Sequence, residues 1–347
     1  MLITIISFAF VFTIITLVHE FGHLCVAKMN GIAVPEFGVG FGPNLYSFSY
    51  HETTYKINLL PLLGYVKIAG LDADEADDKI ISEKNKYYTK KVWQKFLPIV
   101  AGALMNILLG ALVFCFVFLL AGIPSGVSNE IAAISPGSEA ARIGLKAGDK
   151  LLSLDNKPIN DPLEAVKYIH QNPGKQLKLG ILRQDKKLTF VATPTLNTKQ
   201  KIGLIGFQLK TLSKKVGLLS ALYHGFAGAA NLCLAILLIV GQLIVGQVSL
   251  FDLAGPVGIA QITGQYAQGG AFSLLNFLAF FSINVGVLNL LPIPALDGGR
   301  IVFIIIEAFR GKALDIQKEN QFHAVGLTLL LALMAILTVN DLLRLFR

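Results

Sequence analysis

Charged residues are scarce in this chain. Asp, Glu, Lys and Arg make up 15% of its 347 residues and hydrophobic residues 54%, against about 25% charged residues in a typical soluble domain. This shortage excludes an ordinary soluble protein and favours a membrane protein. The three cysteines lie in apolar stretches without metal-binding spacing, which argues against a disulfide framework: Cys25, Cys115 and Cys233. The net charge of +8 comes without an Arg-rich stripe or an aromatic platform, so we expect contact with anionic lipid and no nucleic-acid partner.

Long apolar runs account for the low charge. A helix needs about 20 residues to cross about 30 Å of hydrocarbon. The first run lacks the basic start, the short apolar core and the small-residue cleavage site of a signal peptide, so we expect a retained membrane helix. The sequence predicts four transmembrane helices, within residues 1–28, 96–122, 272–310 and 322–347.

The third of these runs is interrupted by Pro292, Pro294 and the pair Gly298-Gly299. A broken helix is tolerated at membrane depth only where protein or water satisfies the freed backbone groups. The interruption is therefore a candidate functional site.

The clearest chemical signal is His19-Glu20-Phe21-Gly22-His23 in the first run. Residues four apart share one face of a helix, so both histidines can offer a ring nitrogen to one metal ion. Glu20 can reach a water at that metal and take its proton. A helix that carries these polar residues by chance is the structural alternative. Ionisable groups in lipid cost a few kcal/mol each without a partner, which favours the metal site.

A catalytic zinc site usually has a third protein ligand beside an open position. The best candidate is Asp297, which lies at the interruption of the third run. An unpaired carboxylate would be costly there, whereas a carboxylate on zinc would not. Asp297 could also stabilise the first amides of a helix that restarts at Gly298, and both roles are compatible. Weaker ligand candidates are the histidines in polar segments or at the starts of apolar ones: His51, His170, His224 and His323.

The first polar region, residues 29–95, begins with alternate glycines and continues with segments that suggest a short β-hairpin near the membrane. The glycines Gly38, Gly40 and Gly42 let backbone approach backbone, which suits a substrate channel, although they could also form a flexible loop. An acidic stretch between Asp72 and Asp78 follows the hairpin.

The second polar region, residues 123–212, combines strand and helix signals with turns such as Ser135-Pro136-Gly137. The order of strand, tight turn, short helix, turn and strand predicts an inserted α+β domain similar to a PDZ domain. A groove beside its sheet edge could accept a peptide tail as an extra strand. A spacer or steric gate without affinity for peptides is the other open interpretation.

Together these features resemble the site-2 protease family of intramembrane metalloproteases. The resemblance covers essentially the whole chain and is closest to the bacterial branch that cuts membrane-bound anti-sigma factors. Some relatives carry two PDZ domains, whereas this chain has room for one. The resemblance rests on the His-Glu-x-x-His pattern, the PDZ-like domain, the Asn-x-x-Pro-x-Pro-x-Leu-Asp-Gly stretch from Asn289 to Gly298 and Gly255-Pro256-Val257-Gly258.

The resemblance also implies roles for particular residues. Three of them would hold Zn²⁺, one would act as general base, and a polar group would lie near the scissile carbonyl. A glycine-containing loop would dip toward the active site, and the hairpin beside it would receive the substrate as an added strand. The three Zn²⁺ ligands would be His19, His23 and Asp297, and the general base would be Glu20. The polar group would be Asn289, and the loop glycines would be Gly38, Gly40 and Gly42.

The site constrains the topology. The two histidines lie near the far end of the first run and Asp297 must reach the same depth, so the first and third runs cross in the same direction. Residues 213–271 therefore cannot add one full crossing, and we predict a membrane-surface or re-entrant segment. Basic residues such as Lys28 and Lys90 flank one side, which places residues 29–95 in the cytoplasm and the PDZ-like domain outside it.

The predicted fold class is a polytopic α-helical membrane protein with four transmembrane helices, a membrane-associated β-hairpin region and one inserted α+β PDZ-like domain. The predicted function is that of an intramembrane zinc metalloprotease in the bacterial inner membrane. Its substrates would be single-span membrane proteins such as anti-sigma factors, cut in the second step of regulated intramembrane proteolysis. Two alternatives stay open: a membrane adaptor with a structural metal site and a tail-binding domain, and a membrane zinc protease that acts on unfolded extramembranous chains.

Overall fold

The chain forms two compact units, which we call the helical unit and the inserted unit. The helical unit comprises Met1–Leu120 and Gly217–Arg347, and the inserted unit comprises Ala121–Val216. The acidic stretch between Asp72 and Asp78 lies outside the described residues. The computed structural model describes residues 1–71, 81–197, 201–312 and 314–345.

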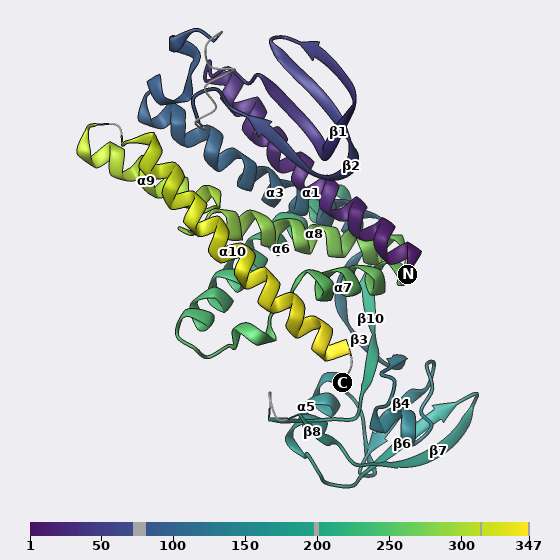
Figure 1. Ribbon diagram of the computed structural model, residues 1–347. Helices are drawn as coiled ribbons and strands as arrows, with labels where there is room; N and C mark the ends of the chain where they lie inside the picture. The colour runs from purple at the N-terminus through teal and green to yellow at the C-terminus, as the bar shows by residue number, and fades with distance from the viewer. Residues whose placement is uncertain (72–80, 198–200, 313, 346–347) are drawn as a thin grey trace. The chain divides into compact units, whose positions relative to one another are not determined.

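The apolar runs of the helical unit form helices (Figure 1). A helix satisfies all backbone groups within its own segment, which is what an apolar run needs in a membrane. In the described part of the chain, five helices are long and apolar enough to cross a membrane: α1, α3, α6, α8 and α10. The helices of this unit are α1 (Leu2–Met29), α3 (Val92–Ala121), α6 (Leu218–Ile244), α7 (Pro256–Gln268), α8 (Ala271–Asn289), α9 (Asp297–Arg310) and α10 (Ile316–Leu345), with short 3-10 turns at Glu83–Asn85, Tyr87–Thr89 and Leu250–Asp252.

Small residues let α3 pack closely against α1 and α8. A Cβ added at Gly22 of α1 would lie 2.6 Å from the Ala101 carbonyl oxygen of α3. A Cβ added at Gly286 of α8 would lie 2.7 Å from the Ala103 carbonyl oxygen. Close backbone approach through small residues is the usual basis of helix association in membranes. As a result α3 contacts both the helix that carries the two histidines and the helix that leads to Asp297.

The interruption of the third apolar run is a compact turn between α8 and α9. The Ile293 N–H donates to the Leu291 carbonyl at 2.6 Å, and the Leu296 N–H donates to the Ile293 carbonyl at 3.2 Å. A Cβ added at Gly298 would lie 2.5 Å from the Leu291 carbonyl carbon, so α9 can begin here only with a glycine at this position. The turn places Asp297 in the first turn of α9.

A small antiparallel sheet lies beside α1 (Figure 1) and consists of β1 (Glu36–Tyr50) and β2 (Thr53–Lys67). The start of β1, Glu36–Val39, pairs on one side with Thr54–Ile57 and on the other with Gly64–Lys67. The strand β2 therefore folds back across β1. The bend includes Leu63, which has a φ of +69°. The end of β2 consequently lies on the far side of β1 from its beginning.

The segment 213–271, predicted as a membrane-surface or re-entrant segment, contains the helix α6. Over Leu218–Ile244 it forms one uninterrupted helix, and its path relative to the membrane stays a prediction. Its glycines do not break the helix. Gly225 packs closely against α3, whereas Gly228 and Gly241 face open space. A Cβ added at Gly225 would lie 2.8 Å from the Cys115 amide nitrogen of α3. The helix is about 40 Å long, which is enough to cross a membrane, and the count of four crossings stays a prediction.

The inserted unit is an α+β structure. Alternate residues of its strand β6 point inward, and Leu177, Leu179 and Ile181 are fully buried in its core with Ile131. The sheet has the strand order β10-β3-β4-β6-β7, with β5 beside β4, and β8 pairs with β9 separately. Its elements are β3 (Ile123–Ile134), α4 (Glu139–Arg142), β4 (Lys150–Leu154), β5 (Lys157–Pro158), α5 (Pro162–Gln171), β6 (Leu177–Arg183), β7 (Lys186–Ala192), β8 (Thr195–Asn197), β9 (Ile202–Leu204) and β10 (Phe207–Lys214).

A buried ion pair stabilises this unit. Arg183 donates from Nε and Nη2 to the two carboxylate oxygens of Asp149, at 2.7 Å each. The Lys146 N–H donates to the same carboxylate at 2.8 Å. The Asp149 side chain is 1% exposed and that of Arg183 24%. The hydrogen bonds from Arg183 hold the pKa of Asp149 below its usual range.

Candidate metal centre

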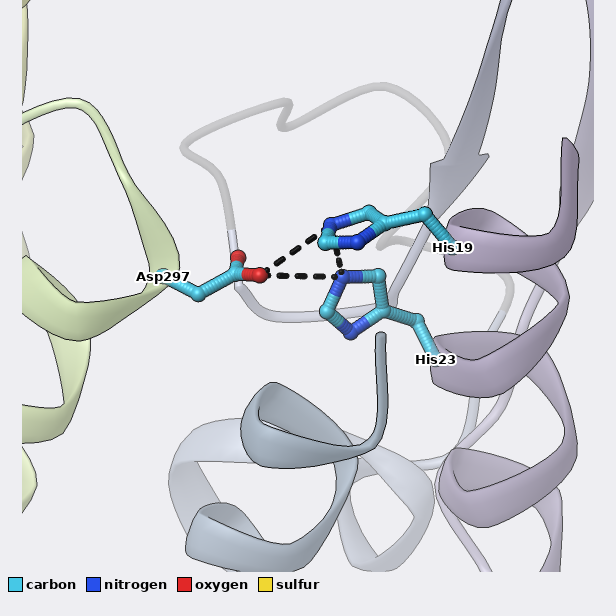
Figure 2. Close-up of side chains that lie close together, drawn as sticks. All are labelled: His19, His23 and Asp297. Atoms are coloured by element: carbon cyan, nitrogen blue, oxygen red, sulfur yellow. Dashed lines mark hydrogen bonds and ion pairs between the residues drawn. The ribbon is translucent and has the colours of Figure 1, made fainter. Parts of the chain in front are cut away.

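Three side chains from distant parts of the chain meet at one point. Figure 2 shows His19 and His23, one turn apart on α1, pointing toward Asp297 at the start of α9. The Asp297 Oδ2 atom lies 3.1 Å from His19 Nε2 and 3.5 Å from His23 Nε2. The two Nε2 atoms are 3.1 Å apart. The structure therefore brings together the three residues that the sequence predicted as metal ligands.

The separations of these atoms fit a zinc ion. Tetrahedral zinc with bonds of about 2.0–2.1 Å places neighbouring ligand atoms about 3.3 Å apart. The observed separations of 3.1, 3.1 and 3.5 Å lie close to this value. Among the described residues, Asp297 Oδ2 has no hydrogen-bond partner although it is buried. A cation between this buried carboxylate oxygen and the two imidazole nitrogens would satisfy all three atoms, so the donor set fits zinc.

The remaining ring nitrogens of both histidines contact α3. His23 Nδ1 lies 2.8 Å from the Pro98 carbonyl oxygen, and His19 Nδ1 lies 3.3 Å from the Asn106 side-chain amide. A carbonyl only accepts, so His23 carries its proton on Nδ1 and keeps the Nε2 lone pair for a metal. The same tautomer of His19 requires Asn106 to present its side-chain oxygen to Nδ1. Pro98 and Asn106 are two turns apart on one face of α3.

The start of α9 does not use Asp297 as its cap. The N-cap residue is Leu296, which makes no side-chain cap hydrogen bond. Asp297 is the acidic residue of the first turn, and its carboxylate faces the histidines. A carboxylate in the first turn is also favourable for the helix dipole. Of the two roles considered from the sequence, the geometry fits that of a ligand, whereas the cap position belongs to Leu296.

A cavity of about 290 Å³ opens at this cluster. Glu20 and Asn289 line it, together with the three ligand candidates. Glu20 is half-buried and has a backbone hydrogen-bond partner in Val66, at the end of β2. Arg300, one turn after Asp297 on α9, lines the same cavity. The cavity thus combines a metal-binding cluster, a carboxylate, a side-chain amide and a guanidinium.

The three glycines predicted to bind substrate lie outside the walls of this cavity. A Cβ added at Gly38 would lie 2.6 Å from the Tyr65 hydroxyl, so the missing side chain makes room for a residue of the same sheet. Gly40 and Gly42 have φ of +81° and +94° and lie where the strand register shifts. The sheet residue that does line the cavity is Val66. A role of the glycines in substrate binding stays a prediction.

Comparison with known families shows which family of proteins this chain belongs to. The sequence model of peptidase family M50 matches residues 7–333. The chain belongs to peptidase family M50. This membership confirms the resemblance to site-2 proteases and the prediction that the chain is a metalloprotease.

Relatives of this M50 protein match it over nearly their full length. The regulator of sigma-W protease RasP of Bacillus subtilis (strain 168) is 32% identical, over 99% of both chains. The zinc metalloprotease RasP of Geobacillus kaustophilus (strain HTA426) is 34% identical, over 99% of this chain and 98% of the relative. Zinc, the predicted cofactor, agrees with the name of the latter. A solved PDZ domain of an SdrC-like protein from Listeria monocytogenes is 27% identical, covers 24% of this chain and 86% of its own, and has a TM-score of 0.22.

Sequence reasoning missed four groups at the site of this M50 protein: the Pro98 carbonyl, the Asn106 and Arg300 side chains and the Val66 backbone. Asn106 carried a detectable signal, because a polar side chain in the middle of an apolar run needs a partner. It is fully buried, and its backbone carbonyl accepts from Ser282 Oγ at 2.7 Å. Backbone groups such as the Pro98 carbonyl carry no sequence signal.

Proposed function

We propose that this M50 peptidase is an intramembrane zinc protease that hydrolyses single-span membrane proteins, in the second cut of regulated intramembrane proteolysis. The observation that carries the proposal is the convergence of His19, His23 and Asp297 at a cavity beside helices apolar enough to cross a membrane. A soluble substrate would not require a site of this kind among such helices.

The residues around the cavity have complementary roles. Zinc held by His19, His23 and Asp297 would supply Lewis-acid chemistry toward a peptide carbonyl. Glu20 takes a proton from the attacking water and returns it to the leaving amine. Asn289 donates from its amide to the oxygen of the scissile carbonyl, where negative charge develops. The shared cavity and the chemistry of each group support these assignments.

The end of β2 suits the placement of a substrate strand. Gly64–Lys67 pairs with β1 on one edge, and its Val66 backbone contacts Glu20. A Cβ added at Gly64 would lie 3.3 Å from Glu20 Cγ, so this segment lies directly against the catalytic base. An unwound substrate segment that pairs with this part of the sheet would bring its peptide bonds to the cavity. Helix-weakening residues in the substrate should favour cleavage.

The position of the site supports four crossings. The histidines lie near the end of α1 and Asp297 follows the end of α8, so α1 and α8 cross in the same direction and α3 returns between them. A full crossing by α6 would then need a second crossing before α8. The intervening α7 has 13 residues and is about 20 Å long, shorter than the hydrocarbon core of about 30 Å.

We assign the protein to the bacterial inner membrane, with the hairpin region on the cytoplasmic side and the inserted unit outside. Basic residues near the ends of α1 and α3, such as Lys28 and Lys90, support this orientation. The inserted unit would receive peptide tails or gate access to the site. The name of the Bacillus subtilis relative, a regulator of sigma-W protease, supports anti-sigma factors as the substrate class.

Zinc content and cleavage together test the proposal. Full-length protein purified in detergent should contain one zinc and cleave a model single-span substrate. Glu20→Gln should keep its zinc and lose activity by about 100-fold or more, because it removes the base, while His23→Ala and Asp297→Ala should lose zinc. Wild-type protein without zinc, or Glu20→Gln with full activity, would contradict the proposal. Digestion of soluble casein as fast as of the membrane substrate would favour a protease of unfolded soluble chains.

A further inference from the structure

The turn that precedes Asp297 contains a strained residue. Ala295 has a φ of +75°, a left-handed conformation that residues other than glycine rarely adopt. It lies two residues before the ligand candidate, so the direction of the chain at Ala295 determines where the Asp297 carboxylate points. A backbone conformation of this kind persists only where neighbouring groups hold it in place.

The group that holds Ala295 comes from α10, which contacts α9 (yellow and light green in Figure 1). The Ala295 N–H donates to Nδ1 of His323 at 3.1 Å. Because Nδ1 accepts this bond, His323 is neutral with its proton on Nε2. The bond joins the turn to a helix that carries none of the three residues of the metal cluster.

The surrounding packing fixes this contact. A Cβ added at Gly299 of α9 would lie 3.1 Å from His323 Cε1, so the ring lies against α9. One turn along α10, a Cβ added at Gly326 would lie 2.6 Å from the Pro294 carbonyl carbon. The imidazole is therefore enclosed by the turn and the start of α9. A side chain in this place contacts the turn that leads to Asp297 and is separate from the three residues of the metal cluster.

We propose that His323 is a positioning residue for Asp297: by accepting the Ala295 N–H, it holds the left-handed turn that aims the Asp297 carboxylate at His19 and His23. The inference rests on the proposed zinc site. It adds a residue that acts through the backbone of the turn, and it predicts that zinc affinity depends on a hydrogen-bond acceptor at position 323.

Zinc affinity of three variants tests the role. The side-chain oxygen of Asn can replace Nδ1 as acceptor, whereas Leu removes the acceptor at similar volume. In full-length protein in detergent, His323→Leu should weaken zinc binding roughly 10-fold or more, the usual effect of losing a ligand-orienting group, and His323→Asn should stay within roughly 3-fold of wild type. Thr328→Ala, which removes an exposed hydroxyl that bonds within α10, is the matched control. The role would be overturned if His323→Leu bound zinc as tightly as wild type. It would also be overturned if His323→Leu and His323→Asn lost zinc affinity equally.

A second background tests the mechanism. Glycine adopts the left-handed conformation without steric cost, so Ala295→Gly should reduce the loss caused by His323→Leu to roughly 3-fold. If His323→Leu lost the same zinc affinity in the wild-type and in the Ala295→Gly background, this mechanism would be overturned. In metal-free protein, amide hydrogen exchange of a peptide covering residues 290–297 should be faster in His323→Leu than in Thr328→Ala, and unchanged exchange would overturn the proposed hydrogen bond. Wild-type protein that binds no zinc would instead end the proposed function, and the exchange measurement would still decide whether His323 holds the turn.

Discussion

Gly102 of α3 lies directly against the imidazole of His23. A Cβ added at Gly102 would lie 2.6 Å from His23 Cε1, a separation that no carbon pair adopts without displacement. The same ring is held by the Pro98 carbonyl, one turn earlier on α3. The face of α3 that contains Pro98, Gly102 and Asn106 therefore defines where both imidazoles can lie. The helix α3 contributes no predicted ligand, but it sets the positions of two predicted ligands, His19 and His23.

Gly102→Ala should therefore weaken zinc binding. The added methyl group displaces the His23 ring, and losing ligand orientation typically costs about 10–100-fold in metal affinity. Ala is a better helix former than Gly by about 1 kcal/mol, so the fold should survive. The measurement is zinc affinity by competition with a chelator. The matched control is Gly228→Ala in α6, where an added Cβ meets nothing within 4 Å; wild-type affinity in Gly102→Ala would refute the steric argument.

Asn106→Leu should also weaken zinc binding, by about 10-fold. The substitution removes the amide that contacts His19 Nδ1 and leaves the ring free to turn or to change tautomer. The absorption spectrum of the Co²⁺-substituted protein should change as well, because it reports ligand geometry. Asn284→Leu on α8 is the control, since the side chain of half-buried Asn284 bonds to Phe280 of its own helix. An unchanged spectrum and affinity in Asn106→Leu would mean that His19 needs no such partner.

Accessibility of single cysteines should report the topology. In intact spheroplasts, a cysteine at exposed Lys157 of the inserted unit should react with a membrane-impermeant maleimide. A cysteine at Glu52, exposed at the tip of the hairpin, should react only after the membrane is permeabilised. The opposite pattern would reverse the orientation, and labelling of both positions in intact cells would contradict a crossing by α3 between them.

The inserted unit should lose stability in acid through Asp149. Arg183 lowers the pKa of Asp149 in the folded state, below its unfolded value of about 3.9. The ion pair therefore stabilises the fold above about pH 4, and this stabilisation is lost as pH falls through the lower folded pKa. Asp149→Asn should destabilise the unit by about 2 kcal/mol at pH 7, less than the 3–5 kcal/mol of a fully buried pair because Arg183 is part-exposed.

Pulse proteolysis of the full-length protein in urea, read by cleavage within residues 121–216, measures this difference. The difference in the free energy of unfolding between wild type and Asp149→Asn should become smaller as the pH approaches 3. The exposed pair between Lys210 and Glu130 provides the control, since Glu130→Gln should change stability little at either pH. A difference in unfolding free energy that stays constant with pH would mean that the carboxylate charge does not stabilise the unit.

Local patterns in the sequence determined the membrane class, the inserted α+β domain and the pairing of His19 with His23. These features depend on the composition of a segment or on residues four apart on one helix, which any α-helix brings to the same face. The interrupted run also marked Asp297 as a residue in need of a partner, because an isolated carboxylate is costly in an apolar segment, and the structure places it against both histidines. The alternate glycines show the limit of this reasoning, since Gly38 makes room for Tyr65 of its own sheet.

Only the tertiary structure decided which groups surround the ligand candidates. Asp297 reaches the histidines because small residues let α3 pack closely against both α1 and α8, and no periodicity of one segment encodes that packing. The contacts of Pro98, Asn106 and Val66 arise between elements that are distant in sequence, and two of the three use backbone atoms that every residue possesses. The pairing of His323 with Ala295 likewise depends on how α10 lies against the turn. A sequence specifies such contacts only through the packing of the whole helical unit, where each side chain constrains its neighbours.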